Sequence, residues 1–308
     1  MREKGILYVV ATPIGNLGDI SGRALDTLSS VDIIAAEDTR RSGLMLSRLG
    51  IKKPLISYYK EKEKSRAVLI VDRLKEGKTV ALISDAGTPC VSDPGAELVR
   101  LAREEGIPVS PIPGACAATA AFSVSGIGGN GFGGCGKHEN GEREYESDGG
   151  KCGNGGRGEG LSGYVFIGFL PRKAKDRKSL IGAFVSSPLP LIFYSAPHDA
   201  QKDLEFLYGE LGARRVYIMR EMTKIYEEII TGVLGELLLE NPKGEFVVIV
   251  EGAGFAPPPS NLTEEEELAE LLAGGMSSKE AVKTVAKNRK TAKDVIYKKY
   301  STMKKNDE

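Results

Sequence analysis

Short apolar runs alternate with amphipathic stretches along the first third of the chain. The runs contain several β-branched residues, whereas apolar positions between them recur at helical spacing. The pattern predicts strands at 6–11, 33–36 and 79–84, and helices at 21–29, 41–49 and 94–105. Such alternation is typical of an α/β fold, in which crossover helices connect the strands of a mostly parallel sheet.

Turn-forming residues mark the ends of these predicted helices. Asp93 directly precedes Pro94, so its side chain is a candidate cap for the helix that begins there. Gly77 and Gly106 each stand just past a predicted helix end.

The pattern disappears between residues 126 and 163. Glycine recurs every two or three residues there, and aliphatic side chains almost vanish. Such a segment buries too little surface to offset its ordering entropy, so we interpret it as a flexible loop or linker. Its Cys135, His138 and Cys152 fit no standard zinc spacing and lack a fourth ligand, so no metal site is predicted.

Regular alternation resumes at Tyr164. Strands are predicted at 164–170, 191–196, 216–222, 228–233 and 245–251, and helices at 174–186 and 199–211. The last strands suit a mixed or antiparallel sheet, which indicates a second α/β domain.

Three consecutive prolines at 257–259 form a stiff spacer, and the pattern beyond them is helical. Thr263 can cap one helix of this tail, and Ser277 or Ser278 can cap the next. The predicted organisation is an α/β domain at 1–125, a Gly-rich segment at 126–163, a second α/β domain at 164–255, and a spacer with a basic helical tail at 256–308.

Composition and charge narrow the functional classes only slightly. The chain has 308 residues with 41% hydrophobic, enough for more than one core. Its 42 basic and 42 acidic residues cancel, so any nucleic-acid footprint must be local. Lysine and arginine dominate residues 279–305, but a solvated helix face explains that cluster as well as RNA contact does.

We expect a cytoplasmic protein with reduced thiols. No apolar run approaches the length of about 20 residues that a membrane helix needs, and Pro13 and Gly15 interrupt the start of the chain before a signal-peptide core. The four cysteines show no regular framework spacing.

Three loops follow predicted strands, where open parallel sheets bind their ligands. The loop at 11–19 has neither the glycine pattern of a dinucleotide site nor that of a P-loop. The loop at 84–95 is dense in turn formers, and its amides or Asp85 could hold polar groups of an adenosine or methionine moiety. The loop at 111–118 has small residues that leave room beside a ligand. Ordinary turns and helix packing remain alternative explanations of all three.

Six ordered motifs resemble one known family. They are ATPIGNLGD at 11–19, AEDTRRS at 36–42, SDAGTPCVSDPG at 84–95, IPG at 112–114, GFLPRK at 168–173 and KGEFVVIVEG at 243–252. These motifs are similar to those of the ribosomal small-subunit RNA (cytidine-2'-O)-methyltransferases, part of the wider tetrapyrrole methylase superfamily. The resemblance covers both α/β domains and the helical tail, and leaves only the Gly-rich segment outside.

The resemblance implies two α/β domains of the tetrapyrrole methylase type, with S-adenosylmethionine in the cleft between them. It also implies a homodimer that acts on RNA of the small ribosomal subunit, at the 2'-hydroxyl of a cytidine. The positions that match cofactor contacts are Pro13, Asp85, Ala86, Gly87, Thr88, Pro89, Val91, Cys116, Ala117, Tyr194, Ala196 and Gly244. A sulfonium is a good leaving group, so alignment of the hydroxyl with the methyl carbon supplies much of the rate.

A nearby base or cation could also help to remove the hydroxyl proton. The candidates are Glu37, Asp38, Arg40, Lys243 and Glu245, each of which could equally belong to a structural ion pair. Phosphate contacts are expected from Arg40, Arg41, Arg172, Lys173, Lys175 and Arg177, although a solvated basic helix again explains several of these residues.

The chain departs from the family pattern at three of these places. Cys116 replaces the serine of the usual Pro-Gly-Pro-Ser loop, and Ser195 and Asp199 replace a glutamate and an arginine. The first change weakens a cofactor contact, and the others affect RNA positioning. Two alternatives therefore stay open: methylation of a tetrapyrrole or other small molecule, and an inactive ribosome-associated RNA-binding relative. The basic tail and the 11–19 and 36–42 motifs oppose the first alternative, whereas the departures and the Gly-rich segment support the second.

Overall fold

The computed structural model describes residues 4–127, 163–239, 242–253, 263–273, 276–288 and 291–306. They fall into two compact units, Met1–Ala253 and Gly254–Glu308. Cys135, His138 and Cys152, with most of the predicted Gly-rich segment and the three prolines of the spacer, lie outside the described residues. Within the described ranges, no helix is long and apolar enough to cross a membrane.

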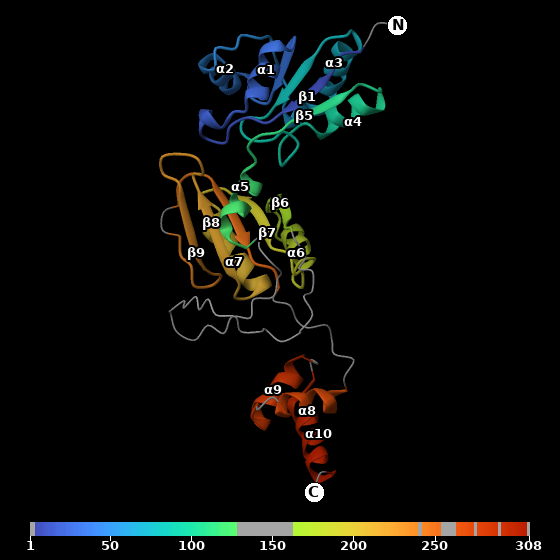
Figure 1. Ribbon diagram of the computed structural model, residues 1–308, viewed down its shortest axis with the longest axis vertical. Coiled ribbons are helices and arrows are strands. Elements are labelled where there is room, and N and C mark those ends of the chain that lie inside the picture. The colour runs from blue at the N-terminus through green and yellow to red at the C-terminus, as the bar shows by residue number, and fades with distance from the viewer. Residues whose placement is uncertain are drawn as a thin grey trace, which may run out of the picture. The chain divides into compact units, whose positions relative to one another are not determined.

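The first sheet of unit Met1–Ala253 has five parallel strands in the order β3-β2-β4-β1-β5. Its strands β1 and β5 are labelled in Figure 1. The strands are β1 (Leu7–Val10), β2 (Ile33–Ala36), β3 (Leu55–Ser57), β4 (Val80–Ile83) and β5 (Val109–Ile112). The helices are α1 (Gly22–Ser30), α2 (Thr39–Arg48), α3 (Glu63–Lys75) and α4 (Ala96–Glu104), with short 3-10 turns η1 (Leu17–Asp19) and η2 (Lys60–Lys62). Because every pair is parallel, all carboxyl ends of the strands reach the same edge.

Alternating side chains bury both faces of this sheet. Leu7 and Leu82 belong to the core with α3 and α4, whereas Val10 and Ile83 belong to the core with α1 and α2. Residues two apart in a strand share a face, which explains the division. The predicted α/β fold is therefore confirmed.

The helix ends lie at the predicted turn-forming residues with one exception. Gly77 and Gly106 follow α3 and α4 with φ of 89° and 63°, as a left-handed helix end requires. The prediction that Asp93 caps a helix is wrong, because α4 begins at Ala96 after Gly95 and has no side-chain cap. Residues 88–95 continue as a loop instead, and the side chain of Asp93 lines a cavity.

The second sheet is mixed, with the order β6-β7-β10-β8-β9. Its strands are β6 (Val165–Phe169), β7 (Leu191–Ser195), β8 (Arg215–Arg220), β9 (Glu228–Val233) and β10 (Phe246–Val250). Only β6 and β7 are parallel, and their register shifts between Phe166 and Phe169.

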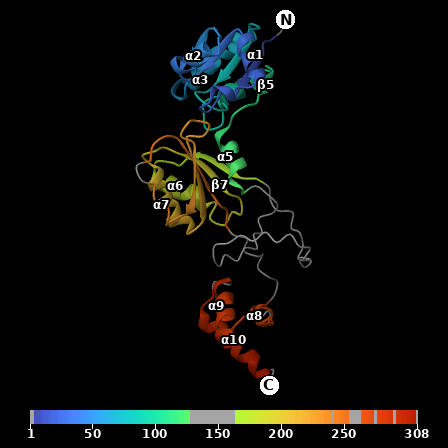
Figure 2. The same cartoon turned by 60° about the vertical axis from the view of Figure 1, so that its left-hand side comes forward.

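Helices cover both faces of the second sheet (Figures 1 and 2). On one face α5 (Ala117–Ser125) packs through Ala118 and Ala121 against Val247 and Ile249. On the other face α6 (Ala174–Gly182) and α7 (Ala200–Leu211) pack against alternate positions such as Val248. The helix α5 ends at residue 125, the predicted end of the first domain, yet its packing partners belong to the second sheet.

Unit Gly254–Glu308 contains α8 (Glu264–Ala273), α9 (Ser278–Asn288) and α10 (Lys293–Asn306) around a core that includes Leu268 and Ile296. Thr263 Oγ1 accepts a hydrogen bond from the Glu266 amide, and the Glu266 carboxylate accepts one from the Thr263 amide. Ser277 Oγ likewise accepts from the Glu280 amide. The predicted capping of this tail by Thr263 and Ser277 is confirmed.

Candidate functional site

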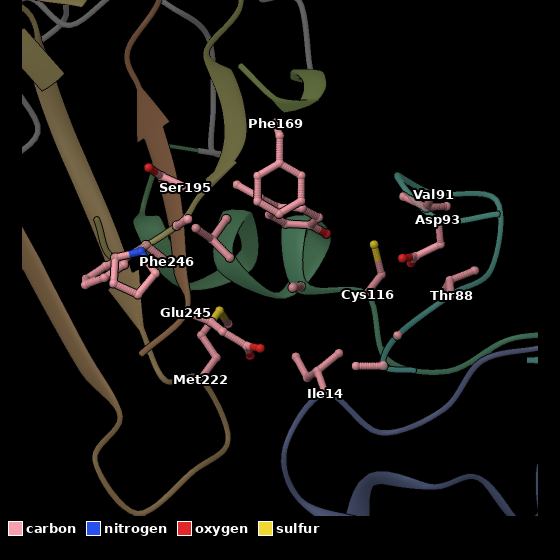
Figure 3. Close-up of a pocket in the computed structure, with 17 residues that line it drawn as sticks. Ile14, Thr88, Val91, Asp93, Cys116, Phe169, Ser195, Met222, Glu245 and Phe246 are labelled. Atoms are coloured by element: carbon pink, nitrogen blue, oxygen red, sulfur yellow. The ribbon is translucent and has the colours of Figure 1, made fainter. Parts of the chain in front are cut away.

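A cavity of about 310 Å³ lies between the carboxyl edge of the first sheet and the second sheet (Figure 3). It falls at the lower end of the usual range of small-molecule pockets, about 300 to 1,000 Å³. We name it the apolar cavity, defined by its lining residues: Ile14, Ala86, Gly87, Thr88, Val91, Asp93, Cys116, Ala117, Phe169, Tyr194, Ser195, Ala196, Pro197, Met222, Glu245, Phe246 and Val247. Of the residues that the structure describes, two carboxylates and no lysine, arginine or histidine line it.

Hydrogen bonds tie the three predicted ligand loops together at this edge. Thr12 and Gly87 exchange backbone hydrogen bonds of 2.8 and 3.0 Å, and Gly87 has a φ of 79° that favours glycine. Thr88 Oγ1 donates to the Ala115 carbonyl at 2.9 Å. The loops at 11–19, 84–95 and 111–118 therefore form one wall.

Strained backbone concentrates at two segments that border the apolar cavity. Among the described residues, the non-glycine positions with positive φ are Cys90, Ser92, Glu221 and Thr223. Val91 lies between the first pair and Met222 between the second, and both line the apolar cavity. Such conformations cost about 1–3 kcal/mol each and cluster at functional sites. The strain supports this cavity as the functional site.

A second, more polar cavity of about 660 Å³ adjoins the first, with which it shares Asp93 and Phe169. We name it the polar cavity, defined by Glu37, Lys60, Glu63, Cys90, Ser92, Asp93, Pro94, Phe166, Ile167, Gly168 and Phe169. The register shift in β6 precedes Phe169, and Gly168 adopts a φ of 66° close to Ser92, where an added Cβ would lie 2.9 Å from Oγ. The bulged strand therefore brings Phe169 to the border of both cavities.

Asp93 is the acid at the junction of the two cavities. Burial raises the pKa of Asp93 to about 6, and the charges of Glu37 and Asp85 add to the rise. Burial and Asp85 also raise the pKa of Glu37. In the part of the chain that the structure describes, the Asp93 carboxylate has no hydrogen bond or ion pair. It can therefore exchange a proton near neutral pH.

Eight of the twelve sequence-predicted cofactor residues line the apolar cavity: Ala86, Gly87, Thr88, Val91, Cys116, Ala117, Tyr194 and Ala196. Pro13, Asp85, Pro89 and Gly244 do not. Asp85 instead accepts hydrogen bonds from Arg41 at 2.8 Å and from the Asp38 amide at 3.1 Å. Gly244 lies against Glu221, where an added Cβ would approach that side chain to 2.6 Å. All twelve cofactor contacts stay predictions.

Two of the five candidate catalytic residues border a cavity. Glu37 lines the polar cavity, and Glu245 lines the apolar cavity while it pairs with Lys224 at 3.0 Å.

The other three have different surroundings. Asp38 caps α2 by accepting from the Arg40 amide at 2.8 Å, and the Arg40 side chain is 92% exposed. The Lys243 carbonyl accepts from Arg220, but its side chain lines neither cavity. These positions favour the structural alternative for Asp38 and leave Glu37 and Glu245 as the stronger candidates.

The basic residues proposed for phosphate contact divide into free and engaged groups. Arg172, Lys173 and Lys175 are exposed, and no carboxylate of the described residues pairs with them. Arg41 pairs with Asp85. Arg177 is only 19% exposed and pairs with buried Asp203 at 3.3 Å, so its guanidinium is directed inward. This geometry removes Arg177 from the set that we propose for phosphate.

Several lining residues had no assigned site role in the sequence. Ile14 and Phe169 stood inside quoted motifs, and Asp93 was one of two carboxylates in the loop at 84–95, so those patterns could have supplied them. Phe246 likewise stood inside the quoted motif at 243–252, whereas Met222 had no local signal, because only the folding of distant strands brings it to the cavity.

The chain is similar to known proteins in sequence. Residues 6–238 match the family model described as Tetrapyrrole (Corrin/Porphyrin) Methylases. The chain is 42% identical to the ribosomal RNA small subunit methyltransferase I of Haemophilus influenzae, with 95% of each chain covered. It is 40% identical to the protein of that name from Halalkalibacterium halodurans, with 96% of this chain and 94% of that one covered.

Solved structures are similar in fold at low sequence identity. The methyltransferase CobJ matches with a TM-score of 0.56 and 18% identity, covering 81% of this chain and 95% of its own. Diphthine synthase matches with a TM-score of 0.57 and 15% identity, covering 80% and 89%. These two similarities concern the arrangement of the chain alone.

Proposed function

The chain belongs to the tetrapyrrole methylase family, and from this premise we propose that it transfers the methyl group of S-adenosylmethionine to the 2'-hydroxyl of a cytidine in small-subunit ribosomal RNA. Three relatives that are 40% to 42% identical to the chain bear the name ribosomal RNA small subunit methyltransferase I. The finer choice of a cytidine ribose rests on the six motifs.

The charge of the apolar cavity is the observation that carries the cofactor assignment. S-adenosylmethionine brings an activated methyl group on a positively charged sulfur, next to an aromatic adenine ring and a charged amino acid. Within the described part of the chain, Asp93 and Glu245 supply the only charged side chains of the lining, and both are acidic. Tyr194, Phe246 and Val247 supply apolar surface for a ring. The residues present therefore fit the group.

The chain's own residues have three tasks in the proposed reaction. The two backbone hydrogen bonds between Thr12 and Gly87 fix the wall formed by the three loops. The strained segments around Val91 and Met222 hold lining side chains in place. The aromatic surface of Tyr194 and Phe169 excludes water from the wall of the cavity. Fixed orientation then brings the acceptor oxygen in line with the methyl carbon.

The substrate RNA, the homodimer and the cytoplasmic location remain part of the proposal. Exposed Arg172, Lys173 and Lys175 follow β6 directly and supply a local basic footprint on a chain without net charge. Analytical ultracentrifugation of the purified protein tests whether it forms the homodimer.

The testing experiment is transfer of labelled methyl from S-adenosylmethionine to small ribosomal subunits that lack this modification, with nuclease mapping of the product. We expect a 2'-O-methylated cytidine. Cofactor binding without transfer would favour another acceptor or the inactive RNA-binding alternative. Absence of cofactor binding in calorimetry would overturn the proposal that the protein is a methyltransferase.

A cavity-filling variant relates the test to the site. Ala117→Leu adds bulk to the apolar cavity from α5, so it should abolish cofactor binding while the protein stays folded. Ser123→Leu on the same helix is exposed and provides the matched control. Equal cofactor affinity in both variants would move the cofactor site elsewhere.

A further inference from the structure

The polar cavity carries an inference that deepens the proposed function and rests on it. We propose that this cavity receives the nucleoside to be methylated, with its base against Phe169 and its ribose hydroxyl against Asp93, which accepts the hydroxyl proton.

The position of the polar cavity is the first argument. It adjoins the apolar cavity and shares only Asp93 and Phe169 with it. A group in one cavity and a group in the other therefore meet at these two side chains. A methyl donor in the apolar cavity has its acceptor in the polar cavity, because the reacting atoms must come within about 3–3.5 Å.

The charge of the polar cavity selects the part of a nucleotide that enters. Glu37, Glu63 and Asp93 line it together with one cation, Lys60. A phosphate would be repelled by three carboxylates, whereas ribose hydroxyls and a base amino group donate hydrogen bonds to them. The nucleoside therefore enters, and the phosphates stay outside near the exposed basic residues that follow β6.

Among these carboxylates Asp93 is free to act. Glu63 Oε1 already accepts from the Gly95 amide at 2.9 Å and from the Tyr58 hydroxyl at 3.1 Å. Glu37 accepts a backbone hydrogen bond from Asp85. Within the described ranges Asp93 has no such partner, so it is the carboxylate of the junction that remains available.

Phe169 supplies a stacking surface at the same junction. Its side chain is 58% exposed, and its ring meets Tyr194 edge-on with centroids 5.6 Å apart. The edge contact with Tyr194 orients the ring, and a base can stack on the exposed part. Aromatic side chains commonly bind unstacked RNA bases in this way.

The proposed step involves the ribose hydroxyl, the methyl sulfonium and the Asp93 carboxylate, and its atoms and charges balance. The ribose oxygen forms a bond to the methyl carbon while the methyl–sulfur bond breaks, and its electron pair stays on sulfur. The hydroxyl proton passes to a carboxylate oxygen of Asp93, so the products are the methyl ether, the neutral thioether and a protonated acid.

The pH dependence follows from the groups that face Asp93. They are Glu37 after β2, Lys60 of η2, Glu63 of α3, Asp85 and Cys90 of its own loop, and Tyr194 and Glu245 of the second sheet. Burial together with Glu37 and Asp85 places the pKa of Asp93 at about 6. Only the ionised carboxylate accepts a proton, so the rate should fall below about pH 6.

The test measures kcat/KM for small subunits that lack the modification, at saturating S-adenosylmethionine and from about pH 5 to 8.5. Wild type should show the acid limb near pH 6. In Asp93→Asn, kcat/KM should be at least about 100-fold lower and should no longer decrease below pH 6. In Asp93→Glu the decrease at acid pH should remain. Asp72→Asn, an exposed acid of α3 outside both cavities, is the matched control.

A second variant tests the base contact independently of Asp93. Phe169→Leu should raise KM for the RNA at least about tenfold and leave the calorimetric affinity for S-adenosylmethionine within about threefold. Tyr208→Leu, which removes a half-exposed aromatic ring of α7, should change neither quantity.

The outcomes separate this inference from the proposed function. If wild type transfers methyl and Asp93→Asn keeps more than a tenth of the rate with the same acid limb, Asp93 is not the proton acceptor. An unchanged KM in Phe169→Leu overturns the base contact. If wild type binds the cofactor but methylates no small-subunit RNA at any pH, the proposed function fails and this inference with it.

Discussion

The hydroxyl of Ser195 donates a 2.6 Å hydrogen bond to the carboxylate of Asp203, which is buried. Ser195 lines the apolar cavity, whereas Asp203 also pairs with Arg177 at 3.3 Å. The guanidinium lies over the Phe206 ring, 5.2 Å from its centroid. Ser195, one of the three positions at which the sequence departs from the family pattern, is therefore held by a buried polar cluster beside the cavity.

Removal of Arg177 should strongly destabilise the protein. Arg177→Met leaves the buried Asp203 without its cation, which costs about 3–5 kcal/mol in comparable cases. Urea unfolding measures the loss of free energy. Lys178→Met on the same helix removes an exposed ion pair with Glu210 and should cost less than about 1 kcal/mol. Equal losses would contradict a structural role for Arg177.

Asp93→Asn should stabilise the protein at alkaline pH while it removes activity. The folded pKa of Asp93, about 6, lies above its ordinary value of 3.8. The unfolded chain therefore loses its proton first, and the free energy of unfolding falls as pH rises through this window. After allowance for solvent screening, the free energy of unfolding of Asp93→Asn should exceed that of wild type by about 1 kcal/mol at pH 8.

The same comparison near pH 4 provides the control for Asp93. There the wild-type carboxyl is protonated in the folded state, so the advantage of the asparagine should shrink towards zero. Urea unfolding at both pH values measures it, and a gain that does not change with pH would show that the carboxylate is not the cause.

Gly95→Ala should be costly for two reasons that can be separated. Gly95 has a φ of 145°, and an added Cβ would lie 2.5 Å from Cys90 Sγ and 2.8 Å from Leu82 Cδ2. Backbone strain and overpacking together should cost about 2–4 kcal/mol in thermal or urea unfolding. Gly50→Ala has a φ of 75° and open space, so it should show only the backbone cost, about 1 kcal/mol. A Gly95→Ala loss no larger than this would contradict the close packing.

Neutralisation of basic residues after β6 should weaken RNA binding in a salt-dependent way. The double variant Arg172→Gln, Lys173→Gln should reduce the slope of log affinity against log salt by about 1.4–1.8, since each phosphate contact contributes about 0.7–0.9. Filter binding to small-subunit RNA measures the slope. Lys52→Gln, Lys53→Gln is the control, because these residues precede β3 and lie at the amino edge of the parallel sheet. An equal effect in both doubles would argue against a local footprint.

The sequence predicted most of the fold because its signals are local. Apolar runs bounded by turn formers located β1, β2 and β4, and Gly77 marked the end of α3. The extent of α3 was not predicted, although Ala67, Ile70, Val71 and Leu74 have helical spacing and are buried.

The site was predictable only in part, because its walls meet through long-range packing. The loop at 84–95 was found from its turn formers, but nothing near Met222 in the sequence indicates that it faces Ile14 across a cavity (Figure 3). Asp93 shows the limit of a local rule. Its neighbour Pro94 favours a helix start, whereas the folded chain continues as a loop and leaves the carboxylate at the junction of two cavities.

The packing of α5 has a consequence for dividing the chain. A break between Ile127 and Gly163 would leave α5 on the fragment that carries the first sheet, although α5 covers an apolar face of the second sheet. The second fragment alone would expose Ile192, Val247 and Ile249 to water. The two fragments should therefore be soluble together rather than apart, and reassociation would rebuild the apolar cavity from two polypeptides.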